Sequence, residues 1–272
     1  MTSEKNIQLG LKEVPETMLW PLWNRASEQA HPKRILNDSM SADLASRIDY
    51  NFEASFGKAS VFHAIRARVI DDKIKAWLKS NPEGTVIALG EGLETQFWRV
   101  DNGILRWISV DLPESVEAQN KLLPSHKRMQ RIPLSALDSK WMEGIPTEKP
   151  VMITAAGLLM YFQESEGKGL LRLIAENFKS GEIVFDMIPK WFSKKTMTGN
   201  YKLTPQYTAP KMPWGLDFDK HSTLEAVHPK LRLIESTTYI DRFSHRARFY
   251  AFLCKIPPIR KRMPGILHMR FG

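Results

Sequence analysis

Short apolar stretches alternate with amphipathic stretches through the middle of the chain. The apolar stretches predict strands at 85–89, 105–110, 127–132, 151–154 and 183–187. Between them, apolar residues recur at helical spacing, which predicts helices at 95–100, 114–123 and 164–178. Strands that alternate with helices are typical of a parallel α/β sheet.

An amphipathic helix precedes these strands, and an irregular segment follows them. Residues 58–80 carry apolar side chains at helical spacing, and an Asn-Pro-Glu-Gly turn ends the predicted helix. Residues 189–229 hold repeated prolines among aromatic residues, and a connection of this length predicts an ordered lid. Two further strands are expected at 231–240 and 266–271, separated by a short helical segment near 243–255.

Composition adds limits to this picture. Hydrophobic residues make up 43% of the chain and charged residues 25%, with no apolar run near the ~20 residues of a membrane span. The single cysteine, Cys254, excludes an intrachain disulfide and a zinc site built on cysteines. No apolar core of signal-peptide length lies near the start. We therefore expect a cytoplasmic protein without a membrane partner or a metal.

The net charge of +9 is concentrated at one end of the chain. Eight basic residues and no acidic residue follow Asp241, so residues 1–241 are close to neutral. This distribution differs from the uniformly basic surface of a nucleic-acid-binding protein, and no nucleic-acid partner is expected. The basic end is either a solvated surface or an attraction for an anionic substrate or partner.

A glycine turn follows the first predicted strand, in "VIALGEGLETQFWRV" (86–100). Gly90 and Gly92 occupy the first two positions of the dinucleotide fingerprint G-x-G-x-x-G, but Thr95 stands at the third. Glu91 and Glu94 would also repel a diphosphate. The turn therefore disfavours NAD. Two interpretations remain: the turn binds a different nucleotide ligand, or it has a purely structural role.

Asp111 ends the next predicted strand, about 20 residues after the glycine turn, where an acidic residue is suited to bind ribose hydroxyls. A site that accepts ribose but not a diphosphate matches S-adenosylmethionine, whose sulfonium tolerates nearby carboxylates. The alternative is that Asp111 caps the helix that begins near Pro113.

A series of motifs in order resembles the leucine carboxyl methyltransferase family, which includes bacterial polyketide O-methyltransferases of the tetracenomycin type. The resemblance rests on the segments "AIRARVIDD" (64–72), 86–114, "LDSKWM" (137–142), "ITAAGLLMYF" (153–162), "IVFDMIPKW" (183–191), "MPWGLD" and "LHMRFG". It covers the chain from about residue 20 to the end. It implies a class I methyltransferase fold, whose seven-stranded sheet has its last strand antiparallel and inserted beside the fifth.

The same resemblance implies roles for individual residues. Arg66 would pair with the methionine carboxylate of the cofactor, since a guanidinium binds carboxylates bidentately; Arg68 or a solvated helix face are the alternatives. The other implied cofactor-binding positions are Gly90, Gly92, Asp111, Leu112, Leu137 beside the adenine, and Asp138.

Two positions depart from the family pattern. Ala156 replaces an acidic residue that would hold the cofactor's ammonium, and Glu91 replaces an alanine of the glycine turn. We expect Glu91 to take over the role left by Ala156, with a solvent-facing turn residue as the alternative. Ala136 replaces an aspartate, and Asp138 is the neighbouring carboxylate that could compensate.

The acceptor side carries aromatic residues but no evident base. Tyr161, Trp191, Phe192, Met212 and Trp214 are predicted to contact the substrate or, alternatively, to form packing cores. Tyr161 is the candidate for a direct role in catalysis. His63, His221, His228 and His245 have no partner in the pattern, and surface or packing roles are expected. A carboxylate acceptor needs no base, so it is mildly favoured over a hydroxyl.

We therefore expect one S-adenosylmethionine-dependent O-methyltransferase domain that acts on a carboxylate or hydroxyl of a small molecule, for which a polyketide-like compound is a candidate. Its parts are a helical cover (1–80), a cofactor-binding core (81–188), a lid (189–229) and the last strands (230–272). Ala136 and Ala156 keep open the alternative of a catalytically silent, cofactor-binding interaction protein. The patterns leave the oligomeric state undetermined.

Overall fold

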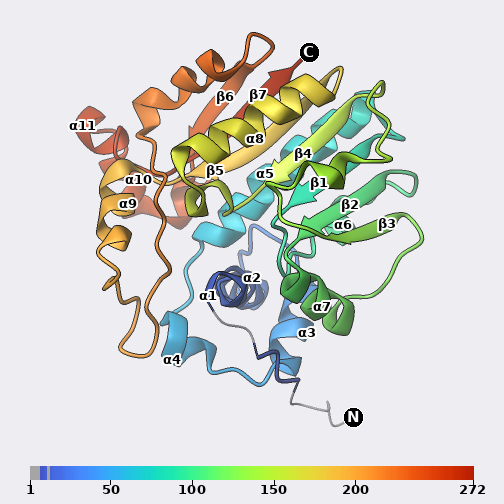
Figure 1. The fold of residues 1–272 in the computed structure, drawn as a ribbon. Coiled ribbons are helices and arrows are strands. Elements are labelled where there is room, and N and C mark those ends of the chain that lie inside the picture. The colour runs from blue at the N-terminus through green and yellow to red at the C-terminus, as the bar shows by residue number, and fades with distance from the viewer. Residues whose placement is uncertain (1–6, 11–12) are drawn as a thin grey trace.

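The computed structural model describes residues 7–10 and 13–272. Its centre is a seven-stranded sheet of order β3-β2-β1-β4-β5-β7-β6 (Figure 1). The strands are β1 (Thr85–Leu89), β2 (Arg106–Asp111), β3 (Met129–Pro133), β4 (Val151–Ala155), β5 (Gly181–Met187), β6 (Arg232–Thr238) and β7 (Gly265–Phe271). β7 is antiparallel to both β5 and β6, while β1 to β5 are mutually parallel. The class I fold and the inserted last strand are confirmed.

Helices cover both faces of the sheet and the carboxyl ends of its central strands. They are α1 (Glu13–Glu16), α2 (Leu19–Gln29), α3 (Ser39–Arg47), α4 (Phe52–Phe56), α5 (Phe62–Ser80), α6 (Gln96–Val100), α7 (Pro113–Leu122), α8 (Glu164–Asn177), α9 (Lys190–Met197), α10 (Arg248–Leu253) and α11 (Pro257–Arg260). Single turns of 3₁₀ type include η1 (Ser139–Met142) and η2 (Leu159–Tyr161), and η3 (Phe218–Val227) is longer. No helix in the described ranges is long and apolar enough to cross a membrane.

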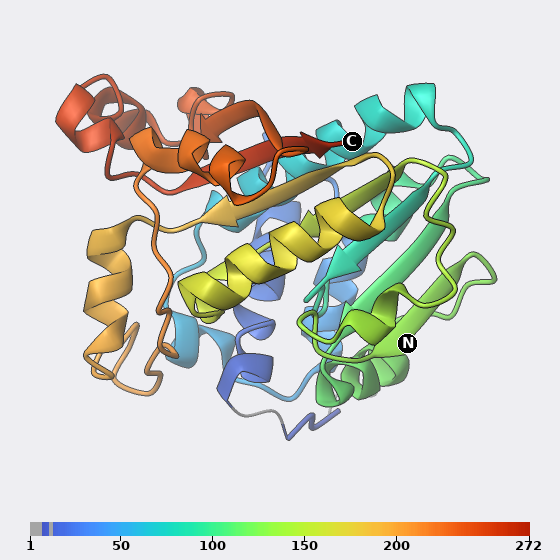
Figure 2. The same ribbon diagram turned by 45° about the horizontal axis from the view of Figure 1, so that its top comes forward.

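Side-chain alternation along the strands builds a core on each face. Ile87, Ile108 and Ile153 face one core, which α8 completes. Val86, Trp107 and Met152 face the other core, against α5 and α6. Figure 2 shows α8 crossing one face of the sheet, with α5 on the other. This alternation explains why the apolar stretches predicted the strands within one or two residues.

The helix predicted at 58–80 begins later than expected, at Phe62. The backbone N–H of Ser60 donates to Oδ1 of Asn24 on α2 (3.0 Å), so the segment before the helix is bound to a neighbouring helix. A side-chain partner from a distant part of the chain could not be seen in the local pattern.

Strand order reverses between β1 and β4, which are neighbours in the sheet although β2 and β3 lie between them in sequence. In open parallel sheets, such a reversal leaves a crevice at the carboxyl ends of the two strands. The N-terminal helices α1 to α4 lie below those ends (Figure 1). A cavity is therefore expected between the sheet and the N-terminal helices.

Candidate functional site

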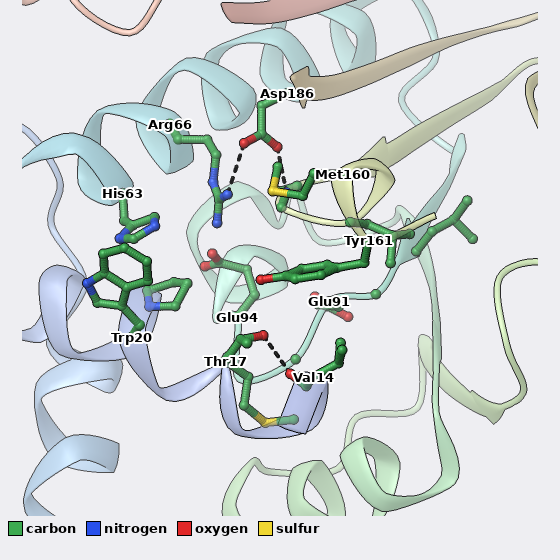
Figure 3. Close-up of a pocket in the computed structure, with 18 of the residues that line it drawn as sticks. Val14, Thr17, Trp20, His63, Arg66, Glu91, Glu94, Met160, Tyr161 and Asp186 are labelled. Carbon is green, nitrogen blue, oxygen red and sulfur yellow. Dashed lines mark hydrogen bonds and ion pairs between the residues drawn. The ribbon is translucent and has the colours of Figure 1, made fainter. Parts of the chain in front are cut away.

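A cavity of about 420 Å³ occupies this crevice. Its floor comes from the ends of β1, β2, β4 and β5, and its walls from α2, the start of α5, η2 and α9. Figure 3 shows Arg66, Glu94, Tyr161 and Asp186 converging on it, with His63 and Trp20 on one side.

The glycine turn after β1 forms one edge of the cavity. Gly90 and Gly92 both have positive φ, 60° and 57°, a conformation that side chains with a Cβ rarely adopt. A Cβ on Gly90 would come within 2.7 Å of Leu158, and one on Gly92 within 2.8 Å of Met18. The turn therefore needs glycine for its backbone angles and for close packing under α2 and η2.

Asp111 at the end of β2 is tied to the glycine turn. One carboxylate oxygen accepts from Gly92 N (2.6 Å), and the other accepts from Leu112 N (2.8 Å). Leu112, not Asp111, occupies the cap position of α7, and no side chain caps that helix. Asp111 lines the cavity together with Leu112, so its side chain orients the turn and does not cap α7.

Arg66 reaches the cavity from α5 and is held by an aspartate. Its Nη1 lies 3.1 Å from Oδ2 of Asp186, at the end of β5, in a buried ion pair. Gly157 N also donates to Asp186 (2.5 Å), and the Tyr239 hydroxyl donates to it as well. Arg68, the alternative, instead pairs with Asp72 on the half-exposed face of α5.

Asp186 was missed from the sequence, although it is a lone acidic residue near the end of a predicted apolar strand. The same feature singled out Asp111 on β2. A systematic search for acidic residues at the ends of the predicted strands would have found both.

Two glutamates line the cavity in different electrostatic states. Glu94 is neutralised by Arg25 (2.9 Å) and Arg99 (2.7 Å), which overcome its burial and hold its pKa below the usual value. Glu91 forms no ion pair among the described residues, and its carboxylate accepts from Trp107 Nε1 (3.2 Å). Burial raises the pKa of Glu91 to about 7, although contacts with Ser109 and Trp107 oppose that shift.

Glu94 belongs to a buried network centred on Arg99. The guanidinium of Arg99 lies 2.7 Å from Asp71 on α5, 2.9 Å from Asp38 before α3, and 2.7 Å from Glu94. Arg25 on α2 also pairs with Asp38 (3.1 Å). This network joins the N-terminal helices to the glycine turn.

Several predicted site residues lie in the cavity wall. Glu91, Ala156 and Tyr161 line it, and so do Trp191, Phe192 and Met212 from the segment after β5. Met212, Phe192 and Tyr161 pack together with Met160 and Ile188 in one small apolar cluster. They make this side of the cavity apolar.

Three predicted positions lie outside the cavity lining. Trp214 is 1% exposed and packs in the sheet core against Gly167 of α8, where an added Cβ would come within 2.0 Å of its ring. Asp138 accepts from Lys140 N (3.0 Å) and thereby caps η1, and Leu137 packs on the core beside it. Ser135 and Ala136 reach the cavity instead.

Comparison with known proteins agrees with this geometry. The profile of the family described as leucine carboxyl methyltransferase matches residues 19–175. The tetracenomycin polyketide synthesis O-methyltransferase TcmP of Streptomyces glaucescens is 28% identical over 269 residues, covering 96% of this chain and 95% of the relative. The S-adenosyl-L-methionine-dependent methyltransferase dpfgK of Gibberella zeae is 31% identical over 201 residues, covering 65% of this chain and 66% of the relative.

Among solved structures, the plantazolicin methyltransferase BpumL in complex with SAH superposes with a TM-score of 0.53 at 11% identity, over 94% of this chain and 98% of that one. This likeness concerns the fold, while the family follows from the matched profile. The chain belongs to the leucine carboxyl methyltransferase family, and it is an S-adenosylmethionine-dependent methyltransferase.

Proposed function

We propose that the chain methylates an oxygen of a small, largely apolar acceptor bound in the cavity between η2 and α9. The observation that carries this proposal is one cavity with a polar end, at the strand termini, and an apolar end, at the cluster containing Met160, Ile188 and Met212. The relative TcmP is named for tetracenomycin polyketide synthesis, and a polyketide-like acceptor suits such an apolar wall.

The polar end fits the cofactor by the chemistry of its donors and acceptors. Asp111 would accept from the ribose, with Leu112 beside it, and Arg66 would bind the carboxylate. Gly90 and Gly92 would let the backbone approach the methionine chain. Glu91 and Asp111 are the cavity carboxylates without a protein cation among the described residues. Asp111 already accepts from two backbone N–H groups and is assigned to the ribose, so we assign Glu91 to the cofactor's ammonium in place of Ala156.

The bound cofactor supplies a methyl group on a sulfonium, and the residues around it orient the acceptor and exclude water. Burial raises the pKa of Tyr161, so its hydroxyl stays protonated and can donate a hydrogen bond to the acceptor oxygen. Burial, reinforced by Arg66 and Arg25, lowers the pKa of His63, which makes it a poor base. This arrangement favours an acceptor that is already anionic, which means a carboxylate over a hydroxyl.

The test uses cofactor labelled in its methyl group and matched pairs of aromatic acids and phenols as acceptors. A carboxylate acceptor gives a methyl ester, which releases volatile methanol on treatment with base, whereas a methylated phenol does not. We expect base-labile label. Base-stable label would contradict the carboxylate assignment, and binding of cofactor without any turnover would favour the silent interaction protein. A cytoplasmic location, and the absence of nucleic-acid and membrane partners, also remain predictions.

Replacing Asp111 with asparagine is expected to weaken S-adenosylhomocysteine binding by about 1.5–3 kcal/mol, because the charged acceptor for the ribose is lost. Asparagine keeps one oxygen that can accept from Gly92 N but turns its NH2 group toward Leu112 N, so only a modest fall in the melting temperature is expected. Calorimetric titration measures the binding. Unchanged affinity together with a large melting shift would assign Asp111 a structural role only.

The unpaired Glu91 carboxylate predicts a pH-dependent site. With its pKa at about 7, Glu91 is mostly neutral at pH 5.5 and mostly ionised at pH 7.5 or above. A ligand ammonium prefers the ionised form, so S-adenosylhomocysteine should bind roughly tenfold more tightly at pH 7.5 than at pH 5.5. Glu91→Gln should remove this dependence, and exposed Glu143→Gln should preserve it.

The raised pKa of Glu91 also makes the stability of the ligand-free protein depend on pH. Because the pKa of Glu91 is higher in the folded protein than in the unfolded chain, wild-type stability falls as pH rises from about 4.5 to 7. Glu91→Gln should therefore stabilise the ligand-free protein at pH 8 by about 3 kcal/mol, with most of the gain absent at pH 5. Urea unfolding at both pH values measures it, and equal gains at the two would contradict the assignment.

A further inference from the structure

His63 stands in the first turn of α5, in the cavity wall, and the mechanism above gives it no positive role. Its ring meets the Trp20 ring edge to face, with centroids 5.1 Å apart. Figure 3 places His63 beside Arg66, which follows it by one helical turn on α5. The sequence pattern suggested only a surface or packing role for this residue.

A buried asparagine determines which nitrogen of His63 carries the proton. Asn24 on α2 is 1% exposed, and its Oδ1 accepts from the backbone N–H of Ser60 (3.0 Å). A backbone N–H can only donate, so the amide oxygen must lie on that side and the amide nitrogen on the other. Nδ2 of Asn24 then donates to Ser60 Oγ (3.3 Å) and to His63 Nδ1 (2.5 Å).

It follows that Nδ1 of His63 is an acceptor and that the ring proton sits on Nε2. The charged groups that act on the ring are Arg25 from α2 and Arg66 from α5, and no carboxylate pairs with it among the described residues. Both cations disfavour an imidazolium. Nε2 has no hydrogen-bond partner in the described part of the chain and is not sealed in the core, so its N–H is open to the cavity.

We propose that His63 and Arg66 together form a carboxylate subsite, in which the Nε2–H of His63 donates to one oxygen and the Arg66 guanidinium binds the other. The ligand group is the amino-acid carboxylate of the cofactor. This inference rests on the proposed function, because that function places the amino-acid end of the cofactor at Arg66. His63 is then a neutral donor, and not the base that a histidine in a transferase cavity suggests.

Two ligands that differ by the amino-acid chain test the subsite. S-adenosylhomocysteine carries the carboxylate, and 5′-methylthioadenosine has the same nucleoside thioether without it. His63→Phe should weaken S-adenosylhomocysteine roughly ten- to a hundredfold and leave methylthioadenosine unchanged within about twofold. His63→Gln, which retains an N–H donor, should recover part of the loss. His126→Phe is the matched control, because His126 packs on Phe97 outside the cavity lining.

Equal losses for both ligands would indicate a structural role for His63 and overturn the proposal. Unchanged binding of both ligands would also overturn it, because His63 would then make no contact with the cofactor's carboxylate. If the wild-type protein bound neither ligand, the proposed function itself would fail. The two failures are therefore distinguishable.

The tautomer is tested separately, by NMR of protein labelled with ¹⁵N in its histidines. At pH 7 His63 should show an unprotonated Nδ1 and a protonated Nε2. Asn24→Asp should move the proton to Nδ1, because a carboxylate can only accept there, and should weaken S-adenosylhomocysteine while sparing methylthioadenosine. A wild-type Nδ1–H tautomer or an imidazolium at pH 7 would overturn the proposal.

Discussion

Arg99→Leu is expected to lower the free energy of unfolding by about 3–5 kcal/mol, the range found when one partner of a buried ion pair is removed. The guanidinium faces Asp38, Asp71 and Glu94, and its side chain is only 7% exposed. Leucine would leave Asp38 and Glu94 with Arg25 as their remaining cation, and Asp71 with none among the described residues. Urea unfolding at pH 7.5 measures the loss.

Acidification provides an internal check on this variant. Uncompensated buried carboxylates have raised pKa values, so Arg99→Leu should lose less stability at pH 5 than at pH 7.5. Adding Asp71→Asn should recover part of the loss by removing one of the charges. Arg68→Leu is the control, because Arg68 pairs with Asp72 on the solvent side of α5 and should cost under about 1 kcal/mol. Equal losses for the two arginines would show that the network contributes nothing beyond a surface pair.

Asp186→Ala should have a comparable cost, again about 3–5 kcal/mol, and should also impair cofactor binding. Asp186 is 1% exposed and holds Arg66, Gly157 N and the Tyr239 hydroxyl. Its removal would leave a buried guanidinium without its carboxylate and a cavity residue without its anchor. Urea unfolding and titration with S-adenosylhomocysteine would report the two effects.

Asp186→Asn keeps an oxygen that can accept from Gly157 N, but it removes the charge and the oxygen that accepts from Arg66 and Tyr239. We expect it to fall between wild type and Asp186→Ala in stability. Glu117→Ala is the control; Glu117 pairs with Lys121 on the solvent side of α7, and its removal should change the stability little. If Asp186→Ala were as mild as this control, Arg66 would not depend on Asp186 for its position.

The continuous apolar stretches were sufficient to predict the central strands, because β1, β2, β4 and β5 are buried on both faces of the sheet. The glycine turn and Asp111 could be placed for the same reason: they follow directly from where two strands end. Residues that directly follow a strand can be located from the local sequence alone. Arg66 was different, since it came from the family resemblance and not from spacing.

Side chains in irregular segments could not be placed in this way. Trp191 and Trp214 looked alike in the sequence, as aromatic residues after the fifth strand, yet one lines the cavity and the other fills the core. The difference arises at Gly167, whose missing Cβ makes room for the Trp214 ring. Such a contact joins two segments that are distant in the sequence, and the local pattern of neither segment predicts the contact. The same holds for Asn24 and His63.

The charged network around Arg99 has a consequence for how ligands reach the cavity. Arg25 and Asp38 bind the N-terminal helices to the glycine turn through buried ion pairs, so lifting those helices would expose several unpaired charges at once. On the opposite side, the Trp191 side chain of α9 is 51% exposed and makes one hydrogen bond within the described part of the chain, from its Nε1 to the Arg262 carbonyl (2.8 Å). Ser193 and Thr196 anchor the body of α9 through hydrogen bonds to the segment around Met212. Cofactor exchange and product release are therefore expected to pass beside the Trp191 side chain, with the N-terminal helices as a fixed wall.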